Sequence, residues 1–172
     1  MRRGTKVINL EAMIKPEGLI HKLYTSFQIK DWKTMQACYH EEATFTDPVF
    51  QKLTAKQVKA MWHMLAGAAQ DLKVLLGEVG VSGNNGSCQW QAWYKFSGTG
   101  RSVHNIIEAQ FEFKDDKIFR HADQFDLWRW SRMALGFPGV LLGWSPLIRN
   151  KIRKTARKGL VKFISEHPEY QL

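Results

Sequence analysis

Cysteine is scarce in this chain of 172 residues, which contains only Cys38 and Cys88. They form no C-x-x-C pair and no spacing typical of a zinc module, so neither a metal-organised nor a disulfide-rich fold is indicated. We predict that both are buried small residues, Cys38 in a helix and Cys88 on a strand. The pattern suits a reducing compartment, and we expect a cytoplasmic protein, although the sequence leaves a disulfide between the two open.

Long apolar runs are also lacking. No stretch of about 18 apolar residues occurs, so no helix is expected to span a membrane. The first ten residues begin with Arg2 and Arg3 but lack an apolar core and a small-residue cleavage site, which argues against a secretory signal. There is no glycine-rich phosphate loop and no metal-type spacing of His, Asp and Glu. We therefore expect neither a metal nor a cofactor.

Repeats, low-complexity tracts and Pro/Gly/Ser-rich linkers are absent, and the length suits one domain with a sizeable core. The net charge of +9 is unevenly distributed along the chain. Residues 1–127 hold 16 Lys and Arg against 14 Asp and Glu, whereas residues 128–172 hold 9 against 2. Any electrostatic partner should therefore meet the C-terminal part.

Apolar residues recur at helical spacing in the first part of the chain. The pattern predicts helices over residues 16–30, 32–40 and 54–69, the first opened by Pro16 and the second capped by Asp31. A short strand, Ala43–Thr46, should end at Asp47-Pro48, because the residue before a proline favours extended geometry.

After residue 70 the apolar period changes to two. Strands are expected over residues 72–81, 87–96, 103–113 and 118–128, with turn signals at 84–86, 97–100 and 114–116. Helices grouped before a meander of antiparallel strands predict an α+β fold, in which a curved sheet closes over three N-terminal helices. Such a sheet leaves a hollow for a small hydrophobic molecule if its inward side chains do not fill the interior.

Two segments carry a family resemblance. Lys30–Pro48 contains an Asp step between two helices, an aromatic residue near the end of the second, an acidic pair, Ala-Thr-Phe and Asp-Pro. Phe111–Asp123 contains a Phe, then Asp-Asp-Lys-Ile and His-Ala-Asp. Both resemble the NTF2-like superfamily, which includes nuclear transport factor 2, ketosteroid isomerase, scytalone dehydratase, limonene epoxide hydrolase and the SnoaL-type polyketide cyclases.

The resemblance covers about residues 16–128 and implies the NTF2-like, or cystatin-like, cone. Residues 1–15 would then be an N-terminal arm and residues 129–172 a C-terminal extension. Because this fold hosts enzymes and non-enzymes, it does not fix the function.

The resemblance also nominates three catalytic residues. Asp47 matches the general base of ketosteroid isomerase, and an apolar pocket would raise its pKa and strengthen it as a base. Its alternative role is to end the strand by accepting loop N–H bonds. Asp123 matches the acid/base carboxylate of the SnoaL cyclases, and His121 lies on the same strand face. The alternative is that His121 and Asp123 only form a satisfied pair inside the sheet.

A larger set of residues is predicted to line the pocket: Leu23, Tyr24, Phe27, Tyr39, Trp62, Asn105, Ala109, Phe111 and Phe125. Two of them depart from the family pattern. Steroid isomerases place an oxyanion-binding Tyr where Leu23 stands, one residue before Tyr24, and a carboxylic acid where Ala109 stands. Without both donors the enolate loses its largest stabilisation, so steroid isomerisation is not expected. Tyr39, predicted at a helix end beside the pocket mouth, has core packing as its alternative role.

The C-terminal part falls outside the family pattern. Residues 129–144 are apolar and broken by Gly and Pro, and Pro146 opens a predicted basic amphipathic helix to about Ser165. Three alternatives stay open for this tail. Its apolar stripe packs on the domain or a twin subunit, the tail covers the pocket, or the helix docks on an anionic membrane. Nucleic acid is the least favoured partner, because no sheet platform with interleaved aromatic residues is evident.

These observations leave three hypotheses for the function. The chain is a cofactor-independent isomerase, cyclase, dehydratase or epoxide hydrolase acting on a small hydrophobic molecule, or it binds such a molecule without turnover. The third hypothesis is an interaction module that uses the mixed sheet face of Gln89, Gln91, Trp93 and Lys95. The resemblance implies a homodimer.

Overall fold

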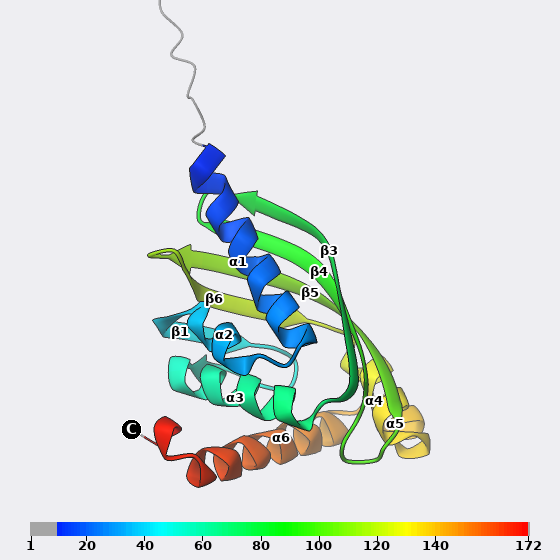
Figure 1. The fold of residues 1–172 in the computed structure, drawn as a ribbon. Coiled ribbons are helices and arrows are strands. Elements are labelled where there is room, and N and C mark those ends of the chain that lie inside the picture. Colours follow the sequence, from blue (N-terminus) through cyan, green and yellow to red (C-terminus); the bar gives the residue numbers. More distant parts are fainter. Residues whose placement is uncertain (1–9, 172) are drawn as a thin grey trace, which may run out of the picture.

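The computed structural model describes residues 10–171, and it has the predicted α+β architecture (Figure 1). Three N-terminal helices cover one face of a curved, unclosed sheet of six strands, as in the NTF2-like cone. The elements are α1 (Leu10–Gln28), α2 (Trp32–Ala37), β1 (Tyr39–Thr46), β2 (Leu53–Thr54), α3 (Ala55–Ala68), β3 (Gln70–Ser82), β4 (Asn85–Lys95), β5 (Ser102–Lys114), β6 (Lys117–Gln124), α4 (Leu127–Leu135), α5 (Phe137–Leu142), α6 (Pro146–Glu166) and the 3-10 turn η1 (Pro168–Tyr170).

The strands lie in the order β2-β1-β6-β5-β4-β3. The predicted meander from β3 to β6 is antiparallel, whereas β1 pairs with β6 in parallel. The last hairpin turns at Asp115 and Asp116, whose φ angles of 52° and 56° are those of a tight two-residue turn. The turn between β3 and β4 lies at Gly83 and Asn84, slightly earlier than predicted.

Three predicted boundaries of elements were wrong. The first helix begins at Leu10 rather than Pro16, because a preference of proline for first turns does not stop a helix from starting earlier. Tyr39 and His40 belong to β1 and not to the second helix, since Tyr39 pairs with Ile118 of β6. The last strand ends at Gln124 rather than 128, because Asp126 caps α4.

The core lies between the helices and the inner sheet face. It is formed by Ile20 and Leu23 of α1, Met61 of α3, and Ile107 and Phe111 of β5, among others. All five are nearly inaccessible to water. Burial of each such side chain contributes about 1.5–3 kcal/mol to stability, so this layer fixes the helices on the sheet.

The helix α6 also packs on this core. Its Leu160 is buried in the core, and Ala156, Phe163 and Ile164 pack against the core residues. The helix α6 lies beside α3 (Figure 1). The helix starts as predicted, with the Ser145 hydroxyl accepting a bond from the Ile148 N–H at 3.3 Å. The apolar stripe of the tail is therefore used within the domain, the first of the three alternatives.

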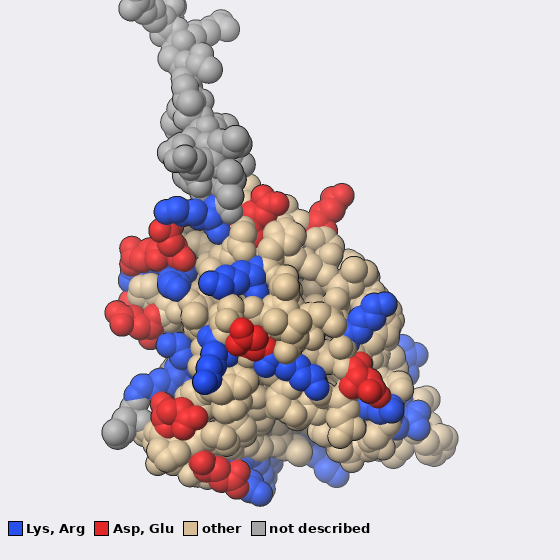
Figure 2. Space-filling view, viewed as in Figure 1, with Lys and Arg blue, Asp and Glu red and all other residues tan. Residues whose placement is uncertain are grey.

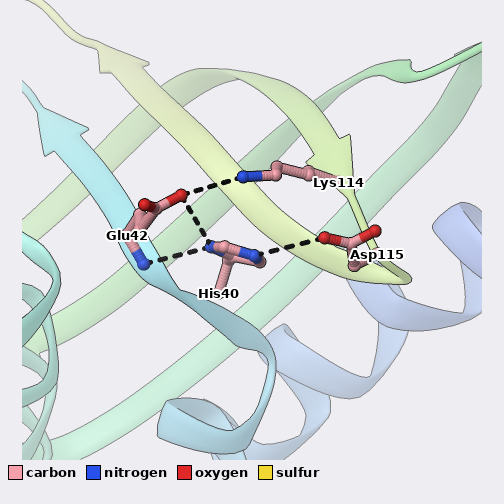
Figure 3. Close-up of polar contacts among 4 residues, drawn as sticks. All are labelled: His40, Glu42, Lys114 and Asp115. Atoms are coloured by element: carbon pink, nitrogen blue, oxygen red, sulfur yellow. Dashed lines mark hydrogen bonds and ion pairs between the residues drawn. The ribbon is translucent and has the colours of Figure 1, made fainter.

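Charged residues tie the start of β1 to the β5–β6 hairpin (Figure 3). Lys114 Nζ lies 2.8 Å from Glu42 Oε2, and His40 Nε2 lies 3.5 Å from Asp115 Oδ2. The hydrogen bond and charge of Lys114 lower the pKa of Glu42. Because Glu42, Lys114 and Asp115 are exposed, each ion pair contributes little to the free energy of unfolding. The contacts position the hairpin next to β1.

Candidate active site

A chain of hydrogen bonds runs through the interior and ends at Asp123. Trp62 Nε1 donates to the Tyr39 hydroxyl at 2.8 Å, and that oxygen lies 2.7 Å from His121 Nδ1. On the other side of the imidazole, Nε2 lies 2.9 Å from Asp123 Oδ1. His121 and Asp123 are 2% and 3% exposed, so the chain is sealed from bulk water.

One hydrogen-bond direction on this chain is fixed by its donor. The indole nitrogen of Trp62 can only donate, so the Tyr39 oxygen accepts there. The Tyr39 hydroxyl shares the next hydrogen bond with His121 Nδ1, and His121 Nε2 shares the last one with Asp123. The imidazole is thus held between two partners, and it fixes the position and orientation of Asp123.

Strand pairing places small side chains beside the Asp123 carboxylate. Asp123 lies opposite Ala109, and Ala109 lies opposite Cys88 on the next strand. One step along the sheet, His121 lies opposite Phe111 and Phe45. Asp123 is thus a buried acid in an apolar and aromatic setting, where an ion is costly unless it is hydrogen-bonded.

Two buried donors in the same interior find no hydrogen-bond partner among residues 10–171: the Tyr24 hydroxyl and Trp90 Nε1. Their rings pack together, with centroids 4.9 Å apart. Burial, and then the charge of Asp123, raise the pKa of Tyr24 well above its ordinary value and the pKa of the Cys88 thiol to about 12. The Cys88 thiol lies beside the Tyr24 hydroxyl, but the distance and angle between them are not those of a hydrogen bond. The hydroxyl therefore stays unpaired.

Unpaired buried donors are unusual in folded proteins, because each costs about 1–3 kcal/mol. A polar group of a ligand, or an ordered water, would satisfy them.

Asp47 performs the loop role that was its alternative. Its Oδ1 accepts the N–H of Val49 at 2.6 Å and the N–H of Phe50. Burial nevertheless raises the pKa of Asp47 to about 7, and the charge of Asp123 adds to the rise. The two N–H groups and Arg153 act in the opposite direction. Asp47 can therefore exchange a proton near neutral pH while it holds the loop.

The other predicted ligand residues fall into two groups. Leu23, Phe27, Trp62, Ala109 and Phe111 are buried in the core, together with Asn105 on β5. Tyr39 was predicted at a helix end by the pocket mouth; it lies instead in β1 and is buried within the hydrogen-bonded chain. Phe125 is half-buried just beyond the end of β6.

A hollow in the described part of the chain lies elsewhere. It has a volume of about 650 Å³, opens to solvent, and is lined by Arg101, Ser102, Arg129, Arg132 and Met133. It therefore lies between α4 and the start of β5, and the hollow expected between helices and sheet stays a prediction.

Within residues 10–171, one group of side chains has the proximity needed for a metal ion. The ligand atoms of His63, His167 and Glu169 lie within 4.8 Å of one another. His167 Nδ1 lies 2.8 Å from the Phe163 carbonyl, which leaves its Nε2 available. The sequence did not suggest this group, because His63 lies far from the other two in the chain.

Sequence reasoning also missed Trp90 and Cys88 as site residues. The alternation of β4 placed both on one strand face with Ala92, which was the available signal. What the pattern could not supply was the lack of a partner for the Trp90 nitrogen, which depends on α1 and on the neighbouring strands.

Comparisons with known proteins agree with this fold. The family model described as "SnoaL-like domain" matches residues 20–121, more than half of the chain. A search of curated proteins gives no match.

Solved structures of similar fold include enzymes and ligand-bound proteins. An epoxide hydrolase of M. tuberculosis superposes with a TM-score of 0.60 at 16% identity, covering 79% of this chain and 96% of that protein. A protein of Jannaschia sp. CCS1, assigned as a SnoaL-like polyketide cyclase, has a TM-score of 0.64 at 14% identity, with coverages of 80% and 100%. TerC, co-crystallised with polyporic acid, has a TM-score of 0.62 at 13% identity, covering 71% of this chain and 99% of that protein. At these identities the likeness establishes the fold alone.

Proposed function

This chain belongs to the SnoaL-like family. On that premise we propose that it is a cofactor-independent acid/base enzyme, and that its substrate is a small hydrophobic molecule that carries a carbonyl or epoxide oxygen. The observation that carries the proposal is a buried carboxylate, Asp123, fixed by His121 in an interior where two donors, Tyr24 and Trp90, have no partner among the described residues. A carbonyl or epoxide oxygen would satisfy these donors, and the apolar surroundings would accommodate the remainder of the molecule.

In this proposal Asp123 accepts a proton and Tyr24 stabilises the oxygen that becomes negative. The proton would come from a carbon next to a carbonyl, or from a water that opens an epoxide. His121 and Tyr39 are positioning residues, because they hold the carboxylate without touching the reacting atoms. Asp47, with its pKa near 7, would be the second proton carrier, matched to neutral conditions.

The departures from the family's oxyanion site bear on this proposal. Leu23 and Ala109 offer no donor, but Tyr24, one residue after Leu23, has an inward hydroxyl with no partner. Tyr24 is thus proposed to supply the donor that the family pattern places one position earlier. The contribution of such a donor is large, since loss of one oxyanion donor commonly lowers kcat by about 10²–10³-fold.

The test uses proton exchange, because it does not require the natural substrate. Enolisable cyclic ketones in D₂O are screened for deuterium uptake by mass spectrometry, and styrene oxide is screened for diol formation. Asp123→Asn and Tyr24→Phe should each abolish or strongly reduce the turnover found. Asp116→Asn, an exposed aspartate on the β5–β6 turn, is the matched control and should leave turnover unchanged. Full turnover in Asp123→Asn would contradict the proposal.

Binding without turnover is the second candidate, and Leu23 and Ala109 favour it because catalysts of the family carry polar groups there. Native mass spectrometry of the purified protein separates the two. A retained hydrophobic molecule that is recovered unchanged, together with no exchange on any ketone, would favour a binding protein.

We further propose that the chain forms a homodimer through the outer sheet face. Trp93 stacks on His104 with centroids 4.4 Å apart, and Leu75 on the neighbouring strand is exposed. A mixed polar and apolar face with an aromatic centre suits association. Light scattering on wild type and on Trp93→Ser tests it; a monomeric wild type would contradict it.

A further inference from the structure

The corner formed by α4, α5 and the start of α6 exposes an unusual amount of apolar surface. Six of the ten exposed large apolar side chains in the described chain lie in residues 137–147: Phe137, Val140, Leu141, Leu142, Trp144 and Leu147. Phe137 and Leu147 are 74% and 75% exposed. Contiguous exposure of this kind marks an interaction surface.

The backbone of this corner is closely packed, so the exposure is not that of a loose tail. A Cβ on Gly139 would lie 2.0 Å from the Ser131 carbonyl oxygen, and one on Gly143 would lie 2.1 Å from the Ser131 hydroxyl. Only glycine allows α5 to approach α4 this closely. The two helices therefore present the apolar side chains from a fixed platform.

Arginines border the apolar corner directly. The Arg101 guanidinium lies about 3.2–3.3 Å from where a Cβ of Gly136 would be, next to Phe137. Arg132 lies over the Trp128 ring at 4.5 Å, and Trp128 lies against Gly143. Arg101, Arg129 and Arg132 line the hollow of about 650 Å³. None of the three forms an ion pair with a carboxylate of the described residues.

The chain segment that contains the corner carries charge of one sign. Between Asp126 and Glu166 the sequence contains 9 Lys and Arg and no Asp or Glu. In Figure 2 acidic and basic residues are interspersed over the helical face, whereas the protruding corner at the lower right, where Figure 1 places α5, is tan with Lys and Arg beside it. A second copy of the chain would bring like charges together on this surface, which disfavours self-association there.

We propose that this corner docks on an anionic lipid bilayer. Phe137, Leu141, Trp144 and Leu147 enter the headgroup region, and the arginines of the hollow bind lipid phosphates. Within residues 10–171 no helix has the length and hydropathy needed to cross a bilayer, so the contact is at the surface. The sequence suggested α6 as the membrane element, but its apolar stripe packs on the core; the docking surface is the corner before it.

The experiment measures binding of the full chain to vesicles by flotation. The protein should float with vesicles of phosphatidylcholine and phosphatidylglycerol, and not with phosphatidylcholine alone, and binding should weaken as salt is added. Brominated lipid should quench tryptophan fluorescence in wild type, a readout that needs no variant. Absence of binding to the mixed vesicles would overturn the proposal.

Paired variants test the basic and the apolar residues of the surface separately. Arg129→Gln with Arg132→Gln should lower vesicle affinity about 25-fold, since each basic residue near an anionic surface contributes about fivefold. Leu141→Ser with Leu147→Ser should lower it at least as much. The matched controls, Ile29→Ser and Arg120→Gln, remove an exposed apolar and an exposed basic residue elsewhere and should bind like wild type.

Other occupants of the corner would give different results. Saturable binding of inorganic phosphate without any vesicle binding would make the hollow a simple anion site and overturn the proposal. A lipid-free dimer that Leu141→Ser with Leu147→Ser converts to monomer would identify a protein interface, with the same consequence.

Discussion

Asp47→Asn should make the protein more stable at pH 8, with little change near pH 4. The asparagine side-chain oxygen can still accept the N–H groups of Val49 and Phe50, so the loop remains held. What the substitution removes is an ionisable group that burial disfavours in its charged form.

The sign follows from proton linkage. The folded protein raises the pKa of Asp47 from 3.8 to about 7, so between these values the native state holds a proton that the unfolded chain has lost. Wild-type stability therefore falls as pH rises through this window, and the whole cost is present above pH 7. A rise from 3.8 to about 7 corresponds to at most about 4 kcal/mol. Because Asp47 keeps partial contact with water, we expect about 2–3 kcal/mol.

Thermal unfolding from pH 4 to pH 8 measures the effect. A difference of about 2–3 kcal/mol should raise the Tm of Asp47→Asn over wild type by roughly 5–10 °C at pH 8, and the gap should close towards pH 4. Asp126→Asn is the matched control, because Asp126 also accepts two backbone N–H bonds but is exposed. The difference in Tm between Asp126→Asn and wild type should not increase as the pH rises. A lower Tm for Asp47→Asn at pH 8 would refute the reasoning.

Three further predictions concern the interior. Tyr24→Phe removes an unpaired buried hydroxyl and should stabilise the protein by about 1 kcal/mol in urea denaturation; a loss above 1 kcal/mol would mean that the hydroxyl is satisfied. His121→Phe leaves Asp123 buried without its partner and should cost about 3–5 kcal/mol, and adding Asp123→Leu should recover part of this loss; strictly additive losses would show that the pair does not interact. Leu160→Ala should cost about 2–4 kcal/mol, whereas Val161→Ala should change stability by less than about 0.5 kcal/mol, and equal effects would mean that α6 does not pack as described.

The amino-acid sequence by itself determined the class of fold and which strand residues face the interior. Periods of 3.6 and 2 are local properties, so they located three helices and four long strands, although the first helix begins six residues earlier than predicted. The same alternation placed His121 and Asp123 on one inward strand face, and burial and hydrogen bonding bear this out. The basic helix was equally predictable from Pro146, which opens it, and from its apolar stripe.

Tertiary contacts decided the rest. Tyr39 leaves the helical pattern because it pairs with Ile118 of β6, and only that pairing brings its hydroxyl to His121. No local pattern reveals that Tyr24 and Trp90 lack partners, since hydrogen-bond satisfaction depends on every element around a buried atom. For the same reason, the apolar stripe of α6 was visible in the sequence, but its packing on the core, and the exposure of the corner before it, were not.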